Sequence, residues 1–349
     1  MKRDWISYAG AGLLAFAVIA IATTGFRSPT TIVIEEATPL ATTTLPGATL
    51  IEAPPQPAAV ADAGAPLDTR KLDAAVRLAG NAAVNILCTT DGSPFKSISG
   101  SGVFIDSRGV ILTAAHIGQY FILRDYPKPN SIRCSVRVGS PAVATYTADP
   151  LYVSTHWITA NQATLSDAAP TGTGESDFAL LYITGTISGT PLPSSFPSLP
   201  LADTDARTGD TVVLAAYGAE FAGSELIQNA LPLIVDGGEI EKVYTFGENT
   251  IDLLSVSGSD TAQEGSSGGA VASLSGEMVG LITTSSAEAD LSSRQVRAIT
   301  PRHIRKNFEL DAGMSLSQYL LSAPLPNLAD AFAARAKALR EILIEATSD

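Results

Sequence analysis

The feature that most constrains the fold is a series of short apolar segments between residues 82 and 299, separated by turn sequences. Turns such as Asp106-Ser107-Arg108-Gly109 and Ser275-Gly276 are typical of hairpins. Convincing long helices are absent from this region, so the pattern predicts an antiparallel β-sandwich or β-barrels. The clearest segments span residues 83–88, 102–105, 110–113, 132–138, 178–183, 212–216, 270–274 and 278–282.

The composition narrows the classes of function. The chain has 349 residues, of which 45% are hydrophobic and 16% charged, so it can bury a substantial core. Its formal net charge of −13 and pI near 4.7 argue against a nucleic-acid partner, because such a partner requires a basic surface. The same charge argues against docking of the soluble part on an anionic membrane.

The N-terminal segment, residues 1–27, predicts export of the remaining chain. No charged residue occurs from Trp5 to Phe26, a run long enough to span a bilayer as a helix, and Lys2 and Arg3 precede it. One interpretation is a retained signal anchor with its N-terminus in the cytoplasm. The other is a signal peptide that is cleaved after Ala20-Ile21-Ala22, so that the protein is secreted. The length of the run favours the anchor.

A tether and a folded domain follow this segment. Residues 28–68 are rich in Thr, Ala and Pro without a sustained period, which indicates an extended linker. Residues 69–80 predict a short helix at the start of the folded domain, and the Pro/Ser-rich stretch 191–200 divides the strand-rich region into two similar halves.

Cys88 and Cys134 are the two cysteines of the chain. In an exported protein a single disulfide between them is the natural hypothesis. The alternative is two separate buried thiols, because the sequence does not give the distance between their Cα atoms.

The pattern changes to helix after Pro301. Residues 316–321 predict a short helix, and Asn327 is the expected N-cap of a longer one, within a C-terminal helical segment at 311–349. The apolar residues of this longer helix fall on one face, which favours packing on its own domain over a coiled-coil partner site. They are Leu328, Phe332, Ala336, Leu339 and Leu343.

Three segments contain candidate catalytic residues. Thr113-Ala114-Ala115-His116 ends a predicted strand, Asp177 stands at the entrance to an apolar strand, and Gly265-Ser266-Ser267-Gly268-Gly269 is a glycine-rich turn. A serine hydroxyl needs an adjacent base with a pKa near the working pH, and histidine is the natural choice. Glycines on both sides of Ser267 would let the backbone approach a substrate closely.

In this order, the three motifs resemble those of the trypsin-like, or chymotrypsin-fold, serine proteases. The resemblance covers about residues 80–308 and is closest in style to the bacterial exported Deg/HtrA type. It implies an all-β fold of two six-stranded antiparallel β-barrels, with the active site between them, in a protease domain at 69–310. The Deg/HtrA enzymes usually carry a PDZ domain, for which the segment after residue 310 is too short.

The resemblance also implies roles for individual residues. His116 would be the general base, Asp177 would orient its ring, and Ser267 would be the nucleophile. The backbone N–H groups of Gly265 and Ser267 would form the oxyanion hole. Secreted animal members have an aspartate where this chain has Ser266, so we expect activity without N-terminal processing.

Alternative interpretations exist for several of these residues. His116 could be a core histidine, and Asp167 or Glu175 could replace Asp177, although the apolar run after Asp177 favours the latter. His156 is expected in a loop, and His303 is expected to cap or decorate the helix after Pro301.

The glycine-rich turn also fits the nucleophile elbow of α/β-hydrolases, with Asp290 and His303 as formal partners. That fold requires a buried strand before the serine and a helix after it. The sequence predicts neither.

By the same resemblance, Thr261 lies at the base of the specificity pocket, and Thr283 and Ser285 lie along one wall. No acidic residue occupies the base, so we expect a preference for small or polar side chains rather than Arg or Lys.

The leading hypothesis is a membrane-tethered serine endopeptidase that acts on proteins or peptides outside the cytoplasm, without a metal or cofactor. The alternative is a catalytically silent, protease-like binding module on a membrane stalk.

Overall fold

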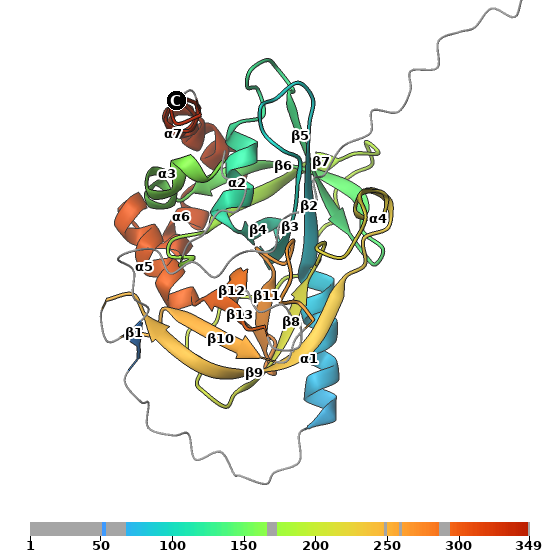
Figure 1. Cartoon of the computed structure of the whole chain (residues 1–349), viewed down its shortest axis with the longest axis vertical. Coiled ribbons are helices and arrows are strands. Elements are labelled where there is room, and N and C mark those ends of the chain that lie inside the picture. The colour runs from blue at the N-terminus through green and yellow to red at the C-terminus, as the bar shows by residue number, and fades with distance from the viewer. Residues whose placement is uncertain are drawn as a thin grey trace, which may run out of the picture. The chain divides into compact units, whose positions relative to one another are not determined.

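The computed structural model describes residues 51–53, 68–165, 173–247, 250–257, 260–285 and 294–347. Within these residues, two antiparallel β-barrels follow one another along the chain, and three helices follow the second barrel (Figure 1). This confirms the all-β core predicted by the sequence pattern and the two six-stranded barrels implied by the resemblance.

The first barrel has six strands in the order β2-β3-β4-β7-β6-β5, and the pairing of β2 with β5 closes it. Alternate residues of each strand point to opposite faces. Val84 and Ile86 of β2 therefore fill the barrel interior, whereas Ala83 and Leu87 join a second cluster that includes residues of the other barrel. The strands are β2 Ala83–Thr90, β3 Ile98–Asp106, β4 Val110–Thr113, β5 Ile132–Val138, β6 Val143–Val153 and β7 Ala179–Thr186.

The second barrel has the strand order β8-β9-β10-β13-β12-β11, and β11 pairs with β8 to close it. On β8, Val212, Leu214 and Ala216 fill its interior, and Val213 and Ala215 face the cluster shared with the first barrel. The strands are β8 Thr211–Ala216, β9 Ile234–Thr245, β10 Leu253–Ser257, β11 Ala270–Ser273, β12 Met278–Ser285 and β13 Val296–Ile299.

Residues 51–53, inside the stretch predicted as a linker, contact this second barrel. The short strand β1 (Ile51–Glu52) pairs with Thr245 and Tyr244 of β9, and the Ala53 N–H donates to the Val243 carbonyl at 3.1 Å. Residues 51–53, which precede both barrels in the sequence, thereby pair with the C-terminal end of β9.

A buried arginine joins the two barrels. Arg137 of β5 is 1% exposed, and its guanidinium donates to the carbonyls of Ile227 at 2.6 Å and Ala142 at 2.8 Å. Burial lowers the pKa of Arg137 from its ordinary value. Because Ile227 belongs to the short helix α4 (Ser224–Asn229), this contact fixes a segment of the second half against β5.

The helix predicted at 69–80 is confirmed as α1 (Thr69–Ala82), which continues directly into β2. Asp68 is its N-cap and accepts a hydrogen bond from the Arg70 N–H at 3.1 Å. Small residues on one face, including Ala75 and Ala79, are buried and let the helix lie close to β8 and β11.

Shorter helices interrupt the strand-rich region. They are α2 (Ala115–Ile122), α3 (Thr155–Asn161) with a following 3-10 turn at Gln162–Leu165, and α4. None contradicts the expectation that long helices are absent there.

The C-terminal helices are α5 (Pro301–Ala312), α6 (Leu316–Ser322) and α7 (Leu325–Glu345). The predicted cap at Asn327 is wrong, because α7 begins at Leu325 after Pro324 and its cap makes no side-chain hydrogen bond. Pro326 lies in the first turn of α7. A proline is tolerated there because backbone N–H groups in the first turn have no acceptor within the helix.

The apolar face of α7 packs on its own domain, as predicted, against β6 and α3. Four of the five predicted face residues are buried, and Ala336 packs against them while partly exposed. The buried residues are Leu328, Phe332, Leu339 and Leu343.

No helix of the described residues is long and apolar enough to cross a membrane. The apolar run from Trp5 to Phe26 lies outside those residues, so the signal anchor or signal peptide stays a prediction.

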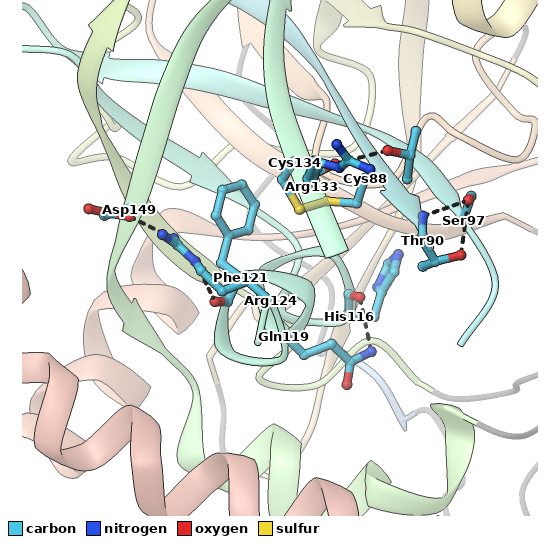
Figure 2. The surroundings of a disulfide bond; sticks show 11 residues. Cys88, Thr90, Ser97, His116, Gln119, Phe121, Arg124, Arg133, Cys134 and Asp149 are labelled. Atoms are coloured by element: carbon cyan, nitrogen blue, oxygen red, sulfur yellow. Dashed lines mark hydrogen bonds and ion pairs between the residues drawn. A yellow bond between two sulfur atoms is a disulfide. The ribbon is translucent and has the colours of Figure 1, made fainter. Parts of the chain in front are cut away.

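The predicted disulfide is confirmed. Cys88 of β2 and Cys134 of β5 lie opposite each other in the strand register, with Cα atoms 4.0 Å apart, and their sulfur atoms are bonded. Figure 2 shows this bridge on the two strands above α2. The bond therefore links the two strands whose pairing closes the first barrel.

The disulfide closes a chain separation of 46 residues. We expect the Cys88→Ala/Cys134→Ala double variant to lose up to about 4 kcal/mol of unfolding free energy, because the unfolded chain gains freedom. Urea unfolding measures this change. A reductant should destabilise the wild type and leave the double variant unchanged. Equal unfolding free energies for the two proteins would contradict the prediction.

Candidate active site

His116 lies in the first turn of α2, immediately after β4 ends at Thr113. Backbone N–H groups in a first turn have no acceptor within the helix. Asp177 supplies one, because its Oδ1 accepts a hydrogen bond from the His116 N–H at 3.0 Å. Its Oδ2 lies 2.8 Å from Nδ1 of the His116 ring. The two bonds fix the orientation of the carboxylate relative to the ring.

The carboxylate of Asp177 is held by an unusual backbone. The Asp177 side chain is 5% exposed, and the preceding Ser176 has φ of 59°, which is uncommon for a residue with a side chain. Ser176 Oγ donates to Asn307 Oδ1 at 3.3 Å, and the Asp177 N–H donates to the Gly174 carbonyl at 3.1 Å. Asn307 of α5 therefore supports the loop, a role that no local sequence signal indicated.

The pKa of His116 is raised above its ordinary value. Burial acts in the opposite direction and lowers it, but the charge of Asp177 and the hydrogen bond to Asp177 together outweigh burial. The ring stays half-buried beside Trp157, with ring centroids 6.3 Å apart. Gln119 Nε2 donates to the His116 carbonyl at 2.9 Å, as Figure 2 shows.

The competing candidates have other surroundings. Glu175 is exposed, and Asp167 lies outside the described residues. His156 was expected in a loop, but it lies exposed on α3. The expectation that His303 caps or decorates its helix is wrong. Thr300 is the N-cap of α5, and His303 is 4% exposed with its Nδ1 3.4 Å from Asp252 Oδ1.

The α/β-hydrolase alternative is excluded by the fold. The segment before Ser267 is a turn, the strand β11 follows it, and all strand pairs of both barrels are antiparallel. Asp290, its formal acid, lies outside the described residues.

The serine turn has the backbone that its glycines permit. Gly265 and Gly268 have φ of +89° and +88°, in the left-handed region that favours glycine. The Gly268 N–H donates to the Ile282 carbonyl at 2.7 Å. Within the described part of the chain, the N–H groups of Gly265 and Ser267 have no hydrogen-bond acceptor.

Ser101 of β3 connects the first barrel to this turn and was missed by the sequence reasoning. Its N–H donates to the Ser267 carbonyl at 2.8 Å, and its Oγ donates to the Gly265 carbonyl at 2.9 Å. The same Oγ accepts a hydrogen bond from the Tyr217 N–H at 2.8 Å. The turn with Ser267 is thereby fixed to the barrel that carries His116 and Asp177.

The hydroxyl of Ser267 points to β12 in this structure. Its Oγ donates to the Thr283 carbonyl at 3.1 Å, and no hydrogen bond joins it to His116 among the described residues. The neighbouring Ser266 is 1% exposed, and its Oγ has no hydrogen-bond partner within the same part of the chain.

The three residues predicted for the specificity pocket lie on two segments. Thr261 and Thr283 are buried, at 1% and 2% exposed. A Cβ atom on Gly174 would come within 2.4 Å of Thr283 Oγ1, so the Thr283 side chain lies against the loop before Asp177. Ser285 ends β12.

Two glycines with the same backbone strain allow a matched test of the turn. A Cβ on Gly268 would lie 2.0 Å from the Ser101 carbonyl oxygen, whereas exposed Gly209, with φ of +89°, has nothing within 4 Å. We expect Gly209→Ala to cost about 1 kcal/mol and Gly268→Ala about 3 kcal/mol or more, with loss of folding as the extreme. Urea unfolding of both variants measures the difference. Equal losses would show that the clash is relieved and the prediction wrong.

Among the described residues, no group of three or more His, Cys, Asp or Glu side chains could hold a metal ion. The site itself consists of the buried Asp177–His116 pair, a serine turn bound to the first barrel by Ser101, and two backbone N–H groups without an acceptor among the described residues.

The chain is similar to one protein family and to several solved structures. The family model described as Trypsin-like peptidase domain matches residues 100–281, which is more than half of the chain. No curated protein sequence matches. Similar solved structures include the active form of the Rv3671c protease from M. tuberculosis, with 17% identity, a TM-score of 0.44, and coverage of 72% of this chain and 89% of that chain. The inactive form of the Rv3671c protease has 16% identity, a TM-score of 0.42, and coverage of 71% and 98%. The family match, which spans His116, Asp177 and Ser267, shows that the chain belongs to the trypsin-like peptidases and is a serine protease of the chymotrypsin fold.

Proposed function

We propose that the protein is an endopeptidase that cleaves peptide bonds through an acyl-enzyme. His116 is the general base, Asp177 orients it, and Ser267 is the nucleophile. The observation that carries the proposal is the pair formed by the buried Asp177 carboxylate and His116 Nδ1, 2.8 Å apart, which leaves Nε2 as the free ring nitrogen.

The reaction follows from this arrangement. Nε2 of neutral His116 takes the Ser267 proton as Oγ attacks the peptide carbonyl carbon, and the resulting imidazolium is stabilised by Asp177. The carbonyl oxygen becomes an oxyanion, which accepts hydrogen bonds from the Gly265 and Ser267 N–H groups. His116 then gives its proton to the leaving amine, and water hydrolyses the acyl-enzyme by the reverse sequence.

Before attack, Ser267 must change rotamer. Its Oγ has to leave the Thr283 carbonyl and turn toward His116. A rotation about one staggered side-chain torsion is sufficient for such a change. Catalytic hydrogen bonds are often absent without substrate and form in the substrate complex.

The same Ser267–Thr283 contact favours the second candidate, a silent protease-like module that binds peptides on a stalk. In that case the serine would stay on Thr283 and the triad would not assemble. The free N–H groups of the turn and the short hydrogen bond between Asp177 and His116 support the enzyme instead, because a binding module requires neither.

We further propose that the domain at 69–310 works outside the cytoplasm on protein or peptide substrates. The apolar run from Trp5 to Phe26 supports membrane attachment, and cleavage of this run is the alternative. The stretch 28–68 would then be a linker that contacts the second barrel at residues 51–53. The Cys88–Cys134 disulfide supports an oxidising compartment. Thr261, Thr283 and Ser285 support a pocket for small or polar side chains, and 311–349 completes the domain surface.

Ser267→Ala provides the first test. A fluorophosphonate probe, which forms a covalent bond only with an activated serine, should label the wild type at Ser267 and should not label the variant. Peptide-bond cleavage should be lost together with the labelling. Ser266→Ala is the matched control, since it removes the neighbouring hydroxyl and should leave labelling intact. A folded wild type without labelling would favour the binding module.

The variant Asp177→Asn tests whether Asp177 orients His116 as the general base. The variant loses the charge that raises the pKa of His116, and the hydrogen bond no longer selects the required tautomer. We expect kcat to fall by about 10⁴-fold. The wild type needs neutral His116, so its activity should increase as the pH rises through the raised pKa. In the Asp177→Asn variant this increase should move to lower pH. A wild-type pH profile of kcat/KM in the variant would contradict the assignment.

A further inference from the structure

A buried ion pair lies beside the serine turn. Arg294 Nη1 and Nη2 donate to the two carboxylate oxygens of Glu220 at 2.6 and 2.9 Å. The two side chains are 8% and 13% exposed. A bidentate arginine–carboxylate contact defines both distance and orientation. The pair therefore fixes the segment after β8 against the segment before β13.

The same two side chains also bind the backbone in front of the turn. Arg294 Nη1 donates to the Ala262 carbonyl at 3.2 Å, and Glu220 Oε2 accepts a hydrogen bond from the Glu264 N–H at 3.3 Å. The Ala219 N–H donates to the Glu264 carbonyl at 2.7 Å. The segments that carry Glu220 and Arg294 thus both bind the backbone of residues 262–264, directly before Gly265.

Gly265 has little freedom next to these contacts. A Cβ atom there would lie 2.8 Å from the Tyr217 carbonyl oxygen and 3.0 Å from the Ala219 nitrogen. The peptide between Glu264 and Gly265 carries the Gly265 N–H. Its carbonyl, that of Glu264, is the group bound by the Ala219 N–H. The direction of the Gly265 N–H therefore depends on where the segment at 219–220 is held.

Glu220, Glu264 and Arg294 form a cluster of three ionisable side chains, in which Glu220 is the ionic partner of Arg294. Burial raises the pKa of Glu264 to about 7, with the charge of Glu220 acting in the same direction and Arg294 opposing both. The Arg294 guanidinium and the Glu220 carboxylate form the ion pair by direct contact. Removing either member leaves a buried charge without its partner.

We propose that the Glu220–Arg294 ion pair positions the oxyanion hole, by holding the peptide that carries the Gly265 N–H in its catalytic orientation. Both are positioning residues, since they act through the backbone of 262–265. The proposal rests on the proposed function. It adds a residue pair that comes from outside the three motifs and acts on transition-state stabilisation rather than on substrate binding.

The test compares Glu220→Gln and Arg294→Lys with the wild type. Glu220→Gln keeps the acceptor for the Glu264 N–H but loses the charge, and Arg294→Lys keeps the charge but loses the bidentate contact. We expect kcat to fall by about 10- to 100-fold in each, with KM changed by less than about twofold. Affinity for a peptide boronic acid, whose tetrahedral adduct occupies the oxyanion hole, should fall by a similar factor.

Arg302→Lys is the control, because Arg302 of α5 forms an ion pair with Asp205 at 2.8 Å and does not contact the turn. It should leave kcat and boronic acid affinity unchanged. Urea unfolding of every variant separates stability from catalysis, and Arg294→Lys carries the test if Glu220→Gln fails to fold. Lower stability with wild-type kcat and boronic acid affinity would overturn the proposal. A wild type that does not react with a fluorophosphonate would overturn the proposed function, and this proposal with it.

Discussion

The structure depends on the hydrogen bonds by which Ser101 joins the two barrels. Ser101 belongs to the first barrel, which carries His116 and Asp177, and its N–H and Oγ bind the carbonyls of Ser267 and Gly265 in the second. Because the side chain is fully buried, water cannot replace these bonds without cost. The proposed catalytic residues are divided between the two barrels, so their relative position depends on a contact of this kind.

Buried charges support the site from both sides. On the first barrel, the carboxylate of Asp177 is held between the N-terminal turn of α2 and the His116 ring. On the second, the Glu220–Arg294 pair binds the backbone that leads into the serine turn. A buried charge is costly unless it is paired and hydrogen-bonded, so each arrangement tolerates few other geometries. Such constraint suits a reaction that depends on positions within fractions of an ångström.

The sequence predicted eight of the twelve barrel strands and missed β6, β9, β10 and β13. Strands such as β4 and β5 are short apolar or alternating runs between turns. β9 was missed because it carries Gly237, Gly238 and several charged residues, yet a Cβ on Gly238 would lie 2.8 Å from Val256, so the glycine permits close strand packing. The strand β6 contains Pro150 and is bulged, so its sequence also lacks the regular pattern of a strand. The cap at Asn327 failed because Pro324 and the buried Leu325 begin α7 earlier.

The sequence by itself determined the family, the order of His116, Asp177 and Ser267, and the pairing of the two cysteines as a hypothesis, because these follow from residue types at local motifs and from their number. Only the tertiary structure decided which residues hold those motifs in place. Ser101, Asn307, Glu220 and Arg294 are far from the residues they support in the chain and carry no local signature. The rotamer of Ser267 on the Thr283 carbonyl is likewise a tertiary property, since β12 supplies the acceptor. Hydrogen bonds between distant segments form only when the barrels close. No local sequence pattern therefore predicts them.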